Sequence, residues 1–206
     1  MKLLKKAHQA VTTAAGKDAS RYILQAVLIE ETENGLKATA TDGRMLAQVE
    51  DKAGTMTADD FPVLEAMKNA PNGAKKALIP AAALAGVKFP RKSTLPILSM
   101  ALASLGETQS TFATTDLETA NVQPARNIEG NFPAYEQVIP TGKNVGQVKM
   151  SVDLMVRALK VLKDTGADAF TLELFGERNA VKMTAETSGE KILVIGMPIA
   201  PDKAAG

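Results

Sequence analysis

The chain has 206 residues, a hydrophobic fraction of 45% and a formal net charge of +1 at pH 7. This length suits one large or two small domains, and the low charge excludes an overall basic coat for nucleic acid, although not a local basic face. The absence of cysteine excludes disulfides, thiolate zinc sites and cysteine nucleophiles, and a reducing cytoplasm is the expected location. No apolar run approaches the roughly 18 residues that a membrane-spanning helix needs.

The first third of the chain predicts a helix followed by three strands. Apolar residues recur at three- and four-residue spacing over 2–14, which is typical of a helix with one buried stripe. The leading strand is reduced to residues 1–3, and His8 is expected to be exposed to solvent among lysines on the polar face of the helix. The strands and the turns between them are expected at 22–30, Asn34-Gly35, 36–41, Asp42-Gly43 and 44–50.

The same order of elements is predicted twice more. The second copy comprises a strand at 77–79, a short helix at 81–87 and strands at 98–104, 110–115 and 120–124. In the third copy Ser151 is a favourable N-cap and Asp153 faces the positive end of the helix dipole. The other elements of this copy are a leading strand at 148–150 and strands at 169–174, 180–184 and 192–197.

Short sequence repeats support this division. Tyr22-Ile23-Leu24 precedes Asp42 by the same interval as Pro96-Ile97-Leu98 precedes Asp116. Asp60-Phe61-Pro62 recurs as Asn131-Phe132-Pro133, which gives a period of about 70 residues. A period of this length is long enough for a small α+β unit. We therefore predict an α+β chain of repeated β-α-β-β-β units, with boundaries in the connectors at 51–76 and 125–147.

Four segments of the chain are similar to segments of one protein family. They are 21–24 with 40–47, 94–99 with 115–118, 130–140, and 197–199. In this order they resemble the sliding DNA clamps, specifically the beta subunit of bacterial DNA polymerase III. The resemblance implies the DNA-clamp fold, with helices lining one face and antiparallel sheets on the other. The chain departs from the family at Met45, where arginine is usual, and after Ile199, where Ala200 and Pro201 replace an arginine and a leucine.

The resemblance also implies a domain organisation and an assembly. We expect a full clamp domain at 1–140, made of units 1–75 and 76–140, then a half clamp domain at 141–200 and a tail at 201–206. Family rings contain twelve such units, so three per chain imply a homo-oligomeric ring of four chains, closed by pairing of edge strands. Such a ring would serve DNA replication as a sliding clamp, a polymerase processivity factor that encircles duplex DNA. It would have no enzymatic activity, no cofactor and no membrane partner. An open adaptor that binds clamp-motif peptides without encircling DNA is the alternative.

A set of cations and one tyrosine are the expected DNA-binding residues. They would attract phosphates in a sequence-independent, salt-sensitive way. From composition alone, lysines opposite an apolar stripe are more often a solvated helix face. The residues are Lys2, Lys5, Lys6, Arg21, Tyr22, Lys88, Arg91, Lys92, Arg157, Lys160 and Lys163.

The resemblance further implies a pocket for short peptide motifs of the replicative polymerase and the clamp loader. Apolar side chains would anchor the peptide, and backbone polar groups would orient it. Ordinary core packing at strand ends is the alternative for Leu24 and Leu46. The expected wall consists of Leu24, Thr41, Gly43, Arg44, Met45, Leu46, Pro133, Val138, Met197, Pro198 and Ile199.

An enzymatic interpretation has little support in the sequence. Asp42 and Asp116 are repeat-related carboxylates, and paired carboxylates can perform acid–base chemistry. Both, however, stand in predicted turns, where aspartate is favoured for its local hydrogen bonds. No phosphate loop, nucleophile motif or ligand cluster with metal spacing occurs in the sequence.

Overall fold

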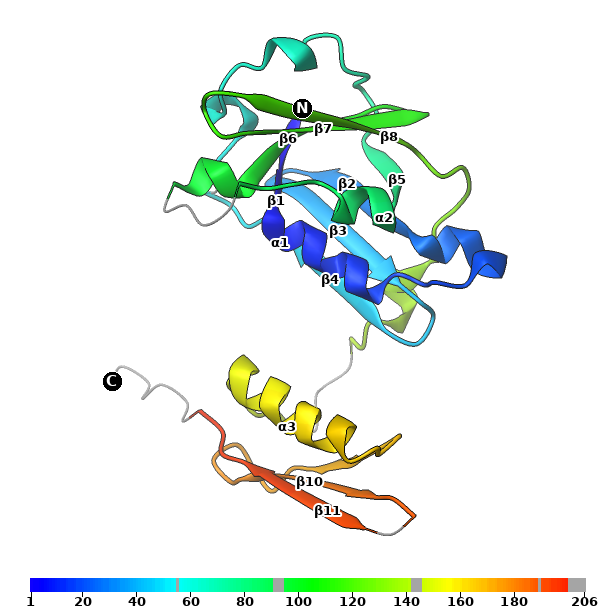
Figure 1. Ribbon diagram of the computed structural model, residues 1–206, viewed down its shortest axis with the longest axis vertical. Coiled ribbons are helices and arrows are strands. Elements are labelled where there is room, and N and C mark those ends of the chain that lie inside the picture. The colour runs from blue at the N-terminus through cyan, green and yellow to red at the C-terminus, as the bar shows by residue number, and fades with distance from the viewer. Residues whose placement is uncertain (55, 91–94, 142–145, 189, 200–206) are drawn as a thin grey trace. The chain divides into compact units, whose positions relative to one another are not determined.

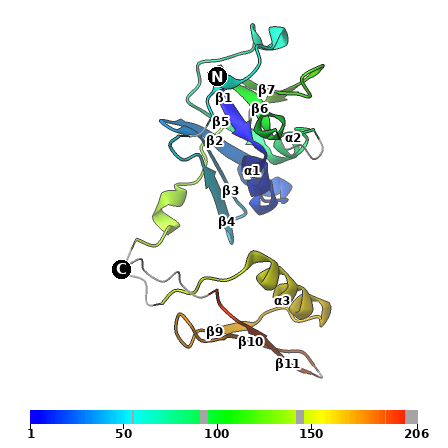
Figure 2. The same cartoon turned by 90° about the vertical axis from the view of Figure 1, so that its left-hand side faces the viewer.

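The computed structural model describes residues 1–54, 56–90, 95–141, 146–188 and 190–199. The chain divides into two compact units, Met1–Ala134 and Tyr135–Gly206, and each is described here by itself (Figures 1 and 2). Among the described residues no helix is long and apolar enough to cross a membrane. The predicted tail at 201–206 lies outside the described residues.

The first repeat of unit 1 begins with a strand and not with the predicted helix. Leu3 and Leu4 are buried in two different clusters, and adjacent side chains reach opposite sides only in extended backbone. The stretch at 22–25, predicted as strand, is 3-10 helix. The elements are β1 (Lys2–Lys5), α1 (Lys6–Gln9), the 3-10 helices η1 (Ala10–Ala14) and η2 (Ala19–Gln25), β2 (Ala26–Thr32), β3 (Gly35–Thr41) and β4 (Leu46–Glu50).

The second repeat follows the predicted order closely. Short 3-10 helices occupy the connector between the repeats, η3 (Ala58–Asp60) and η4 (Glu65–Met67). The later elements are β5 (Lys76–Pro80), α2 (Ala81–Ala85), η5 (Pro96–Ser99), β6 (Met100–Leu105), β7 (Gln109–Thr115) and β8 (Ala120–Arg126). The repeated Tyr-Ile-Leu and Pro-Ile-Leu segments lie in η2 and η5, directly before the first long strand of each repeat.

The two repeats of unit 1 exchange their leading strands. The sheets have the orders β4-β3-β2-β5 and β1-β6-β7-β8, and all neighbours are antiparallel. Lys5 pairs with Met100, and Pro80 pairs with Ala26 in the equivalent position of the other sheet. Each sheet is therefore completed by a strand from the other repeat.

The core of unit 1 is shared by both repeats in the same way. One buried cluster combines Leu4 and Val11 of the first repeat with Leu84 and Phe112 of the second. The helices are also joined, because Gln9 Nε2 lies 2.8–2.9 Å from the carbonyl oxygens of Leu84, Ala85 and Val87. Neither repeat alone could bury this apolar surface.

His8 lies inside this core and is fully buried, so its predicted exposure was wrong. The switch from β1 to α1 turns the ring inward, where Nδ1 accepts a hydrogen bond from Lys5 N at 2.9 Å. Nε2 therefore carries the hydrogen and lies 3.2 Å from Leu36 O. Burial lowers the pKa of His8, and the nearby carboxylate of Asp51 opposes this shift without reversing it.

In the described part of unit 2 the α-helix α3 packs on a three-stranded sheet. Its elements are η6 (Tyr135–Val138), α3 (Val152–Asp164), β9 (Thr171–Glu173), β10 (Val181–Glu186) and β11 (Lys191–Gly196), and the sheet order is β11-β10-β9. Ser151 Oγ caps α3 by accepting from Leu154 N at 3.4 Å, as predicted. Ala158 and Leu162 pack on Val181 and Met183 of β10. The predicted leading strand at 148–150 was wrong, because these residues join no strand within the described part of unit 2.

Candidate functional site

The turn between β3 and β4 is organised by Asp42. Its Oδ1 accepts hydrogen bonds from Arg44 N and Met45 N, both at 2.8 Å. Thr41 Oγ1 donates to Met45 O at 2.6 Å and accepts from Gly43 N at 3.1 Å. The backbone amides of Met45 and Arg44 hold the pKa of Asp42 below its usual value.

The turn between β7 and β8 repeats this geometry group by group. Asp116 Oδ1 accepts from Glu118 N at 3.1 Å and from Thr119 N at 2.6 Å. Thr115 Oγ1 donates to Thr119 O at 2.7 Å and accepts from Leu117 N at 2.9 Å. Backbone and side-chain hydrogen bonds from Thr119 likewise lower the pKa of Asp116. The two carboxylates are thus engaged in building turns, which accounts for their repetition without catalysis.

One residue in each turn adopts a left-handed backbone conformation. Gly43 has φ +89° and its counterpart Leu117 has φ +79°. Glycine takes this conformation at little cost, whereas a side chain is strained there. The relaxed turn is therefore the one that carries the predicted pocket residues.

Most residues of the unit 1 part of the predicted pocket lie in and beside the turn between β3 and β4. Thr41 pairs with Leu46 across the turn, and the Met45 side chain is exposed at its tip. Arg21 Nη1 lies 3.8 Å from the position that a Cβ on Gly43 would take, so η2 borders the turn. The remaining predicted residues of this unit are Leu24, half-buried, and Arg44 and Pro133, both exposed.

The other predicted wall residues belong to unit 2. Val138, Met197 and Ile199 have exposed side chains and Pro198 is half-buried. Ile199 N donates to Lys149 O at 2.7 Å, which holds the segment after β11 beside the segment before α3. The pocket as one continuous wall across both sets of residues stays a prediction.

The predicted DNA-binding residues of unit 1 fall into two groups. Lys2 and Lys5 lie on β1, half-buried, and not on a helix as predicted; Lys5 Nζ is 2.6 Å from Asp51 Oδ1. The exposed members are Lys6, Arg21, Tyr22 and Lys88. Arg91 and Lys92 lie outside the described residues. Lys5 is therefore committed to an ion pair, whereas the exposed group is accessible to a phosphate.

In unit 2 the predicted cations all lie on α3 with exposed side chains. Lys160 Nζ is 2.6 Å from Asp164 Oδ2, an i,i+4 pair that neutralises part of its charge. Arg157 and Lys163 are exposed beside it.

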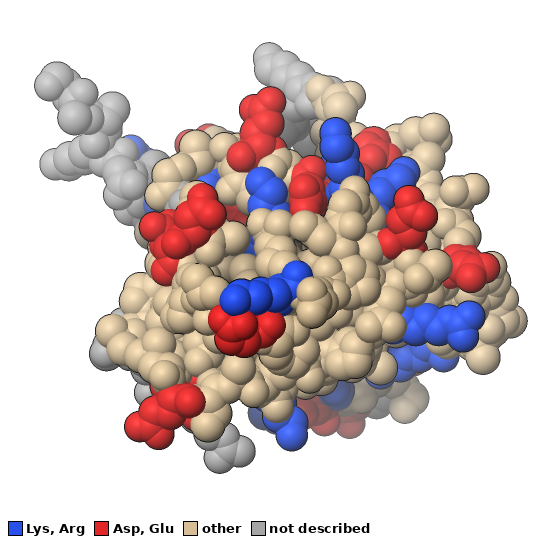
Figure 3. Space-filling model, turned by 90° about the horizontal axis from the view of Figure 1, so that it is seen from above, with Lys and Arg blue, Asp and Glu red and all other residues tan. Residues whose placement is uncertain are grey.

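Basic and acidic side chains are interspersed on the molecular face shown in Figure 3, in keeping with the net charge of +1.

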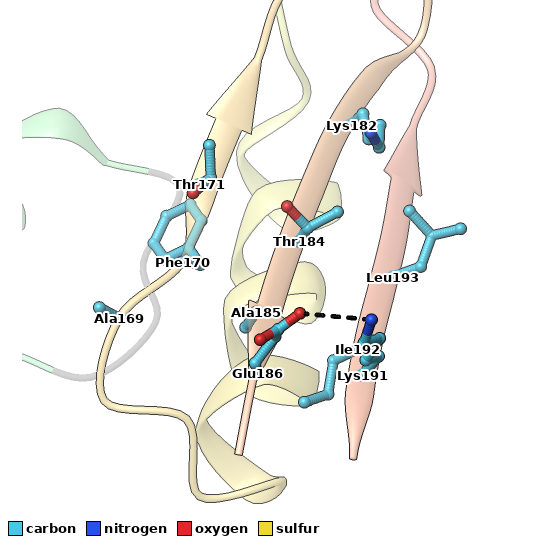
Figure 4. Close-up of a pocket in the computed structure, with 10 residues that line it drawn as sticks. All are labelled: Ala169, Phe170, Thr171, Lys182, Thr184, Ala185, Glu186, Lys191, Ile192 and Leu193. Atoms are coloured by element: carbon cyan, nitrogen blue, oxygen red, sulfur yellow. Dashed lines mark ion pairs between the residues drawn. The ribbon is translucent and has the colours of Figure 1, made fainter. Parts of the chain in front are cut away.

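Cavities also lie beside the strands of both units, and the predicted DNA-binding residue Lys88 lines one of them. An open hollow of about 580 Å³ lies against the sheet of unit 2, lined by residues along β10 and β11 and by Phe170 and Thr171 (Figure 4), and Lys191 Nζ stands 3.8 Å from Glu186 Oε1 at one side. A smaller one of about 190 Å³ lies at the Asp116 turn, beside Lys88 and Phe89. Neither could be found from the sequence, because each is formed by residues from separate segments. No group of three or more acidic or histidine side chains able to hold a metal ion occurs among the described residues.

No protein-family model matches the sequence, and no curated protein matches it either. Solved structures do match. The DNA polymerase III beta chain of Streptococcus pneumoniae aligns with a TM-score of 0.66 and 20% identity over 95% of this chain and 48% of that one. The beta subunit of Streptococcus pyogenes gives 0.65 and 19% over 96% and 50%, and the sliding clamp of Bacillus subtilis gives 0.65 and 14% over 96% and 48%.

The chain thus spans about half the length of the solved clamps that it matches. The likeness includes both units, because it extends over nearly every residue of the chain. It agrees with the combination of helices and antiparallel sheets described above. The chain has the DNA-clamp fold of the bacterial DNA polymerase III beta subunits.

Proposed function

We propose that this protein is a sliding DNA clamp, a non-enzymatic processivity factor that encircles duplex DNA and tethers a replicative polymerase and a clamp loader. The observation that carries the proposal is the fold likeness over 95–96% of the chain to proteins named as sliding clamps. The proposal includes a full clamp domain over 1–140 and a half domain over 141–200.

The attraction to DNA is assigned to the exposed cations. Lys6, Arg21 and Lys88 in unit 1 and Arg157 and Lys163 in unit 2 have side chains that reach solvent. Contacts of this kind to phosphates are independent of base sequence and weaken with salt. A low net charge suits a protein that moves along DNA, because retention by a closed ring does not require tight binding.

The partner site is assigned to the turn at 41–46 together with Leu24, Pro133, Val138 and 197–199. Met45 and Met197 offer exposed, flexible side chains of the kind that adapt to several peptides. Polar backbone groups of the neighbouring strands would orient an extended peptide.

The assembly is a ring of four chains closed through edge strands. β4 is an edge strand of one sheet of unit 1 and β8 is an edge strand of the other, and pairing these two edges between chains would protect their free backbone groups. Pairing of edge strands also fixes the relative orientation of neighbouring chains.

The test is retention on DNA of different topology. The protein, incubated with a clamp loader, ATP and nicked circular DNA, is expected to stay bound at high salt and to dissociate when the circle is linearised. Retention that is the same on circular and linear DNA would contradict encirclement.

One observation favours the alternative, an open adaptor that binds clamp-motif peptides only. Two of the predicted DNA-binding lysines, Lys5 and Lys160, are already paired with Asp51 and Asp164. The adaptor would bind the peptides in the same way but show no retention on circular DNA.

A further inference from the structure

The sheet of unit 2 leaves one strand of its inner surface uncovered. Leu172 of β9 stands opposite Met183 of β10, which is fully buried under α3, so the two share one face of the sheet. Leu172 is nevertheless 44% exposed, and Phe170 and Leu174 on either side are 42% and 45% exposed. In unit 1 the corresponding residues of β2, Val27 and Ile29, are both 0% exposed.

The flank of α3 is uncovered as well. Val152, Val156 and Leu159 follow i, i+4, i+7 spacing, which aligns them along one side of the helix. They are 76%, 58% and 41% exposed, while Ala158 and Leu162 on the adjacent side pack against the sheet. In unit 1 the helices of the two repeats contact each other, and Gln9 reaches across to the end of α2.

The edge of β9 is a third open surface. In unit 1 the equivalent strands β2 and β6 each pair with the leading strand of the other repeat. β9 is the last strand of its sheet, and the leading segment at 148–150 joins no sheet in the described part of the chain. In unit 1 the second repeat covers all three of these surfaces.

We infer that unit 2 of a second copy of this chain covers them, related to the first by a two-fold axis. The occupant must itself carry an apolar helix flank and a segment before its helix that can pair with the edge of β9. Unit 2 carries both, and residues 148–150, which form no strand in the single chain, would become its leading strand only in the dimer. The axis is perpendicular to α3, so the two helices run in opposite directions. Asp153 in the first turn of each then lies towards Lys163 in the last turn of the other, which makes the contact complementary in charge.

The exchange in unit 1 also fixes the register of the contact. There the residues that precede the helices, Lys5 and Pro80, pair with Met100 and Ala26. These two partners lie in line, across the sheet, with the hairpin pair nearest the turn, which is Thr115 with Ala120 in one sheet and Thr41 with Leu46 in the other. In unit 2 the last hairpin pair is Glu186 with Lys191. The same relationship places Lys149 of one copy opposite Thr171 of the other. Two such dimers can be accommodated in the proposed ring of four chains. The inference rests on the fold of unit 2 and does not depend on DNA binding or peptide binding.

Size-exclusion chromatography with light scattering on the full chain is the first test. The expected mass is an even multiple of 21.7 kDa, and Val156→Asp is expected to halve it. The matched control is Leu193→Asp, which places the same charge at an exposed apolar residue on the opposite face of the sheet and should leave the mass unchanged. A monomeric wild-type protein at micromolar concentration, or an equal effect of both variants, would overturn the inference.

Cross-linking is the second test, and the absence of cysteine makes it specific. Lys149→Cys and Thr171→Cys are made in separate chains, mixed and oxidised. Only the mixture should give a disulfide-linked dimer, since cross-strand partners lie within disulfide range. Thr184→Cys, one strand further from the edge, replaces Thr171→Cys in the control mixture. Equal yields in the two mixtures, or no cross-linked dimer, would contradict the pairing, while the peptide-binding and DNA-retention tests would remain open.

Discussion

Oδ1 of Asp51 lies 2.6 Å from Nζ of Lys5, and Oδ2 of the same carboxylate accepts a hydrogen bond from Leu36 N at 3.0 Å. The Asp51 side chain is nearly buried. It therefore joins β1 to the start of β3, two strands that belong to different sheets.

Replacement of Asp51 by alanine is expected to destabilise the protein by about 2–3 kcal/mol, because it leaves the Leu36 amide and the Lys5 ammonium without their partner in a poorly solvated place. Urea unfolding followed by circular dichroism measures this. Glu65→Ala is the control, since its ion pair with Lys68 is exposed and contributes less than about 1 kcal/mol. Equal losses in the two variants would contradict the role of Asp51.

The free energy of unfolding is expected to decrease as the pH is lowered, because of His8. Its folded pKa lies below the ordinary value of 6.5, so the unfolded chain binds a proton more readily than the native one. The contribution of His8 is complete above pH 6.5 and is lost as pH falls through that value towards the folded pKa. The single histidine permits direct titration by NMR, and Asp51→Asn should lower its pKa further. A native pKa at or above 6.5 would be inconsistent with the buried neutral ring.

Substitutions at the left-handed residues of the two turns, Leu117 and Gly43, are expected to change the stability of the protein in opposite directions. Leu117→Gly should stabilise the protein by up to about 1 kcal/mol, because it removes strain from an exposed side chain at positive φ. Gly43→Ala should destabilise by about 1 kcal/mol, since no atom nearer than Arg21 Nη1 at 3.8 Å obstructs the new Cβ and only the backbone is strained. Thermal unfolding of both variants measures the two shifts, and shifts of the same sign would refute the shared geometry.

Binding of a clamp-motif peptide is expected to weaken when Leu46→Ala and Met197→Ala are combined. Each truncation removes apolar contact from the proposed wall, and a loss of about tenfold or more corresponds to about 1.4 kcal/mol. Fluorescence anisotropy with a labelled peptide measures the dissociation constant, and circular dichroism confirms folding. Leu193→Ala, on the outer face of the unit 2 sheet, is the control. An unchanged constant in the double variant would remove these residues from the site.

Charge reversal at Lys6, Arg157 and Lys163 should weaken DNA binding more at low than at high salt. The slope of log K against log salt concentration is negative, and each lost phosphate contact makes it shallower by about 0.9. Filter binding over a salt series provides the slope. Lys191→Glu, on β11 and highly exposed, is the control for a general change in charge. A salt-independent loss would argue against phosphate contacts.

Much of the fold could be predicted from patterns local to the sequence. The stripe at 154–162 and the cap at Ser151 define α3, and the Asp42 and Asp116 turns follow from their own side-chain hydrogen bonds. The start of the chain was mistaken for helix because Leu3, Leu4, Ala7 and Val11 also fit a helical period. Their true environment depends on β6, far along the chain.

The site was less predictable for the same physical reason. That Met45 stands exposed at a turn follows from its neighbours. His8, however, contacts Leu36 and Lys5 pairs with Asp51, and no local pattern connects either of these partners to the start of the chain. Long-range polar contacts of this kind are formed by the tertiary fold and leave no periodicity in the sequence.

The exchange of leading strands has a consequence for synthesis on the ribosome. β1 leaves the ribosome before β6, which is its only partner strand among the described residues and in which Ala103 pairs with Lys2. Contacts so distant in sequence slow folding, because a long loop must close before they form. The first repeat therefore emerges with its leading strand unpaired and waits for about one hundred residues of translation. Its nascent state is the stage at which the chain is most open to aggregation or to chaperones.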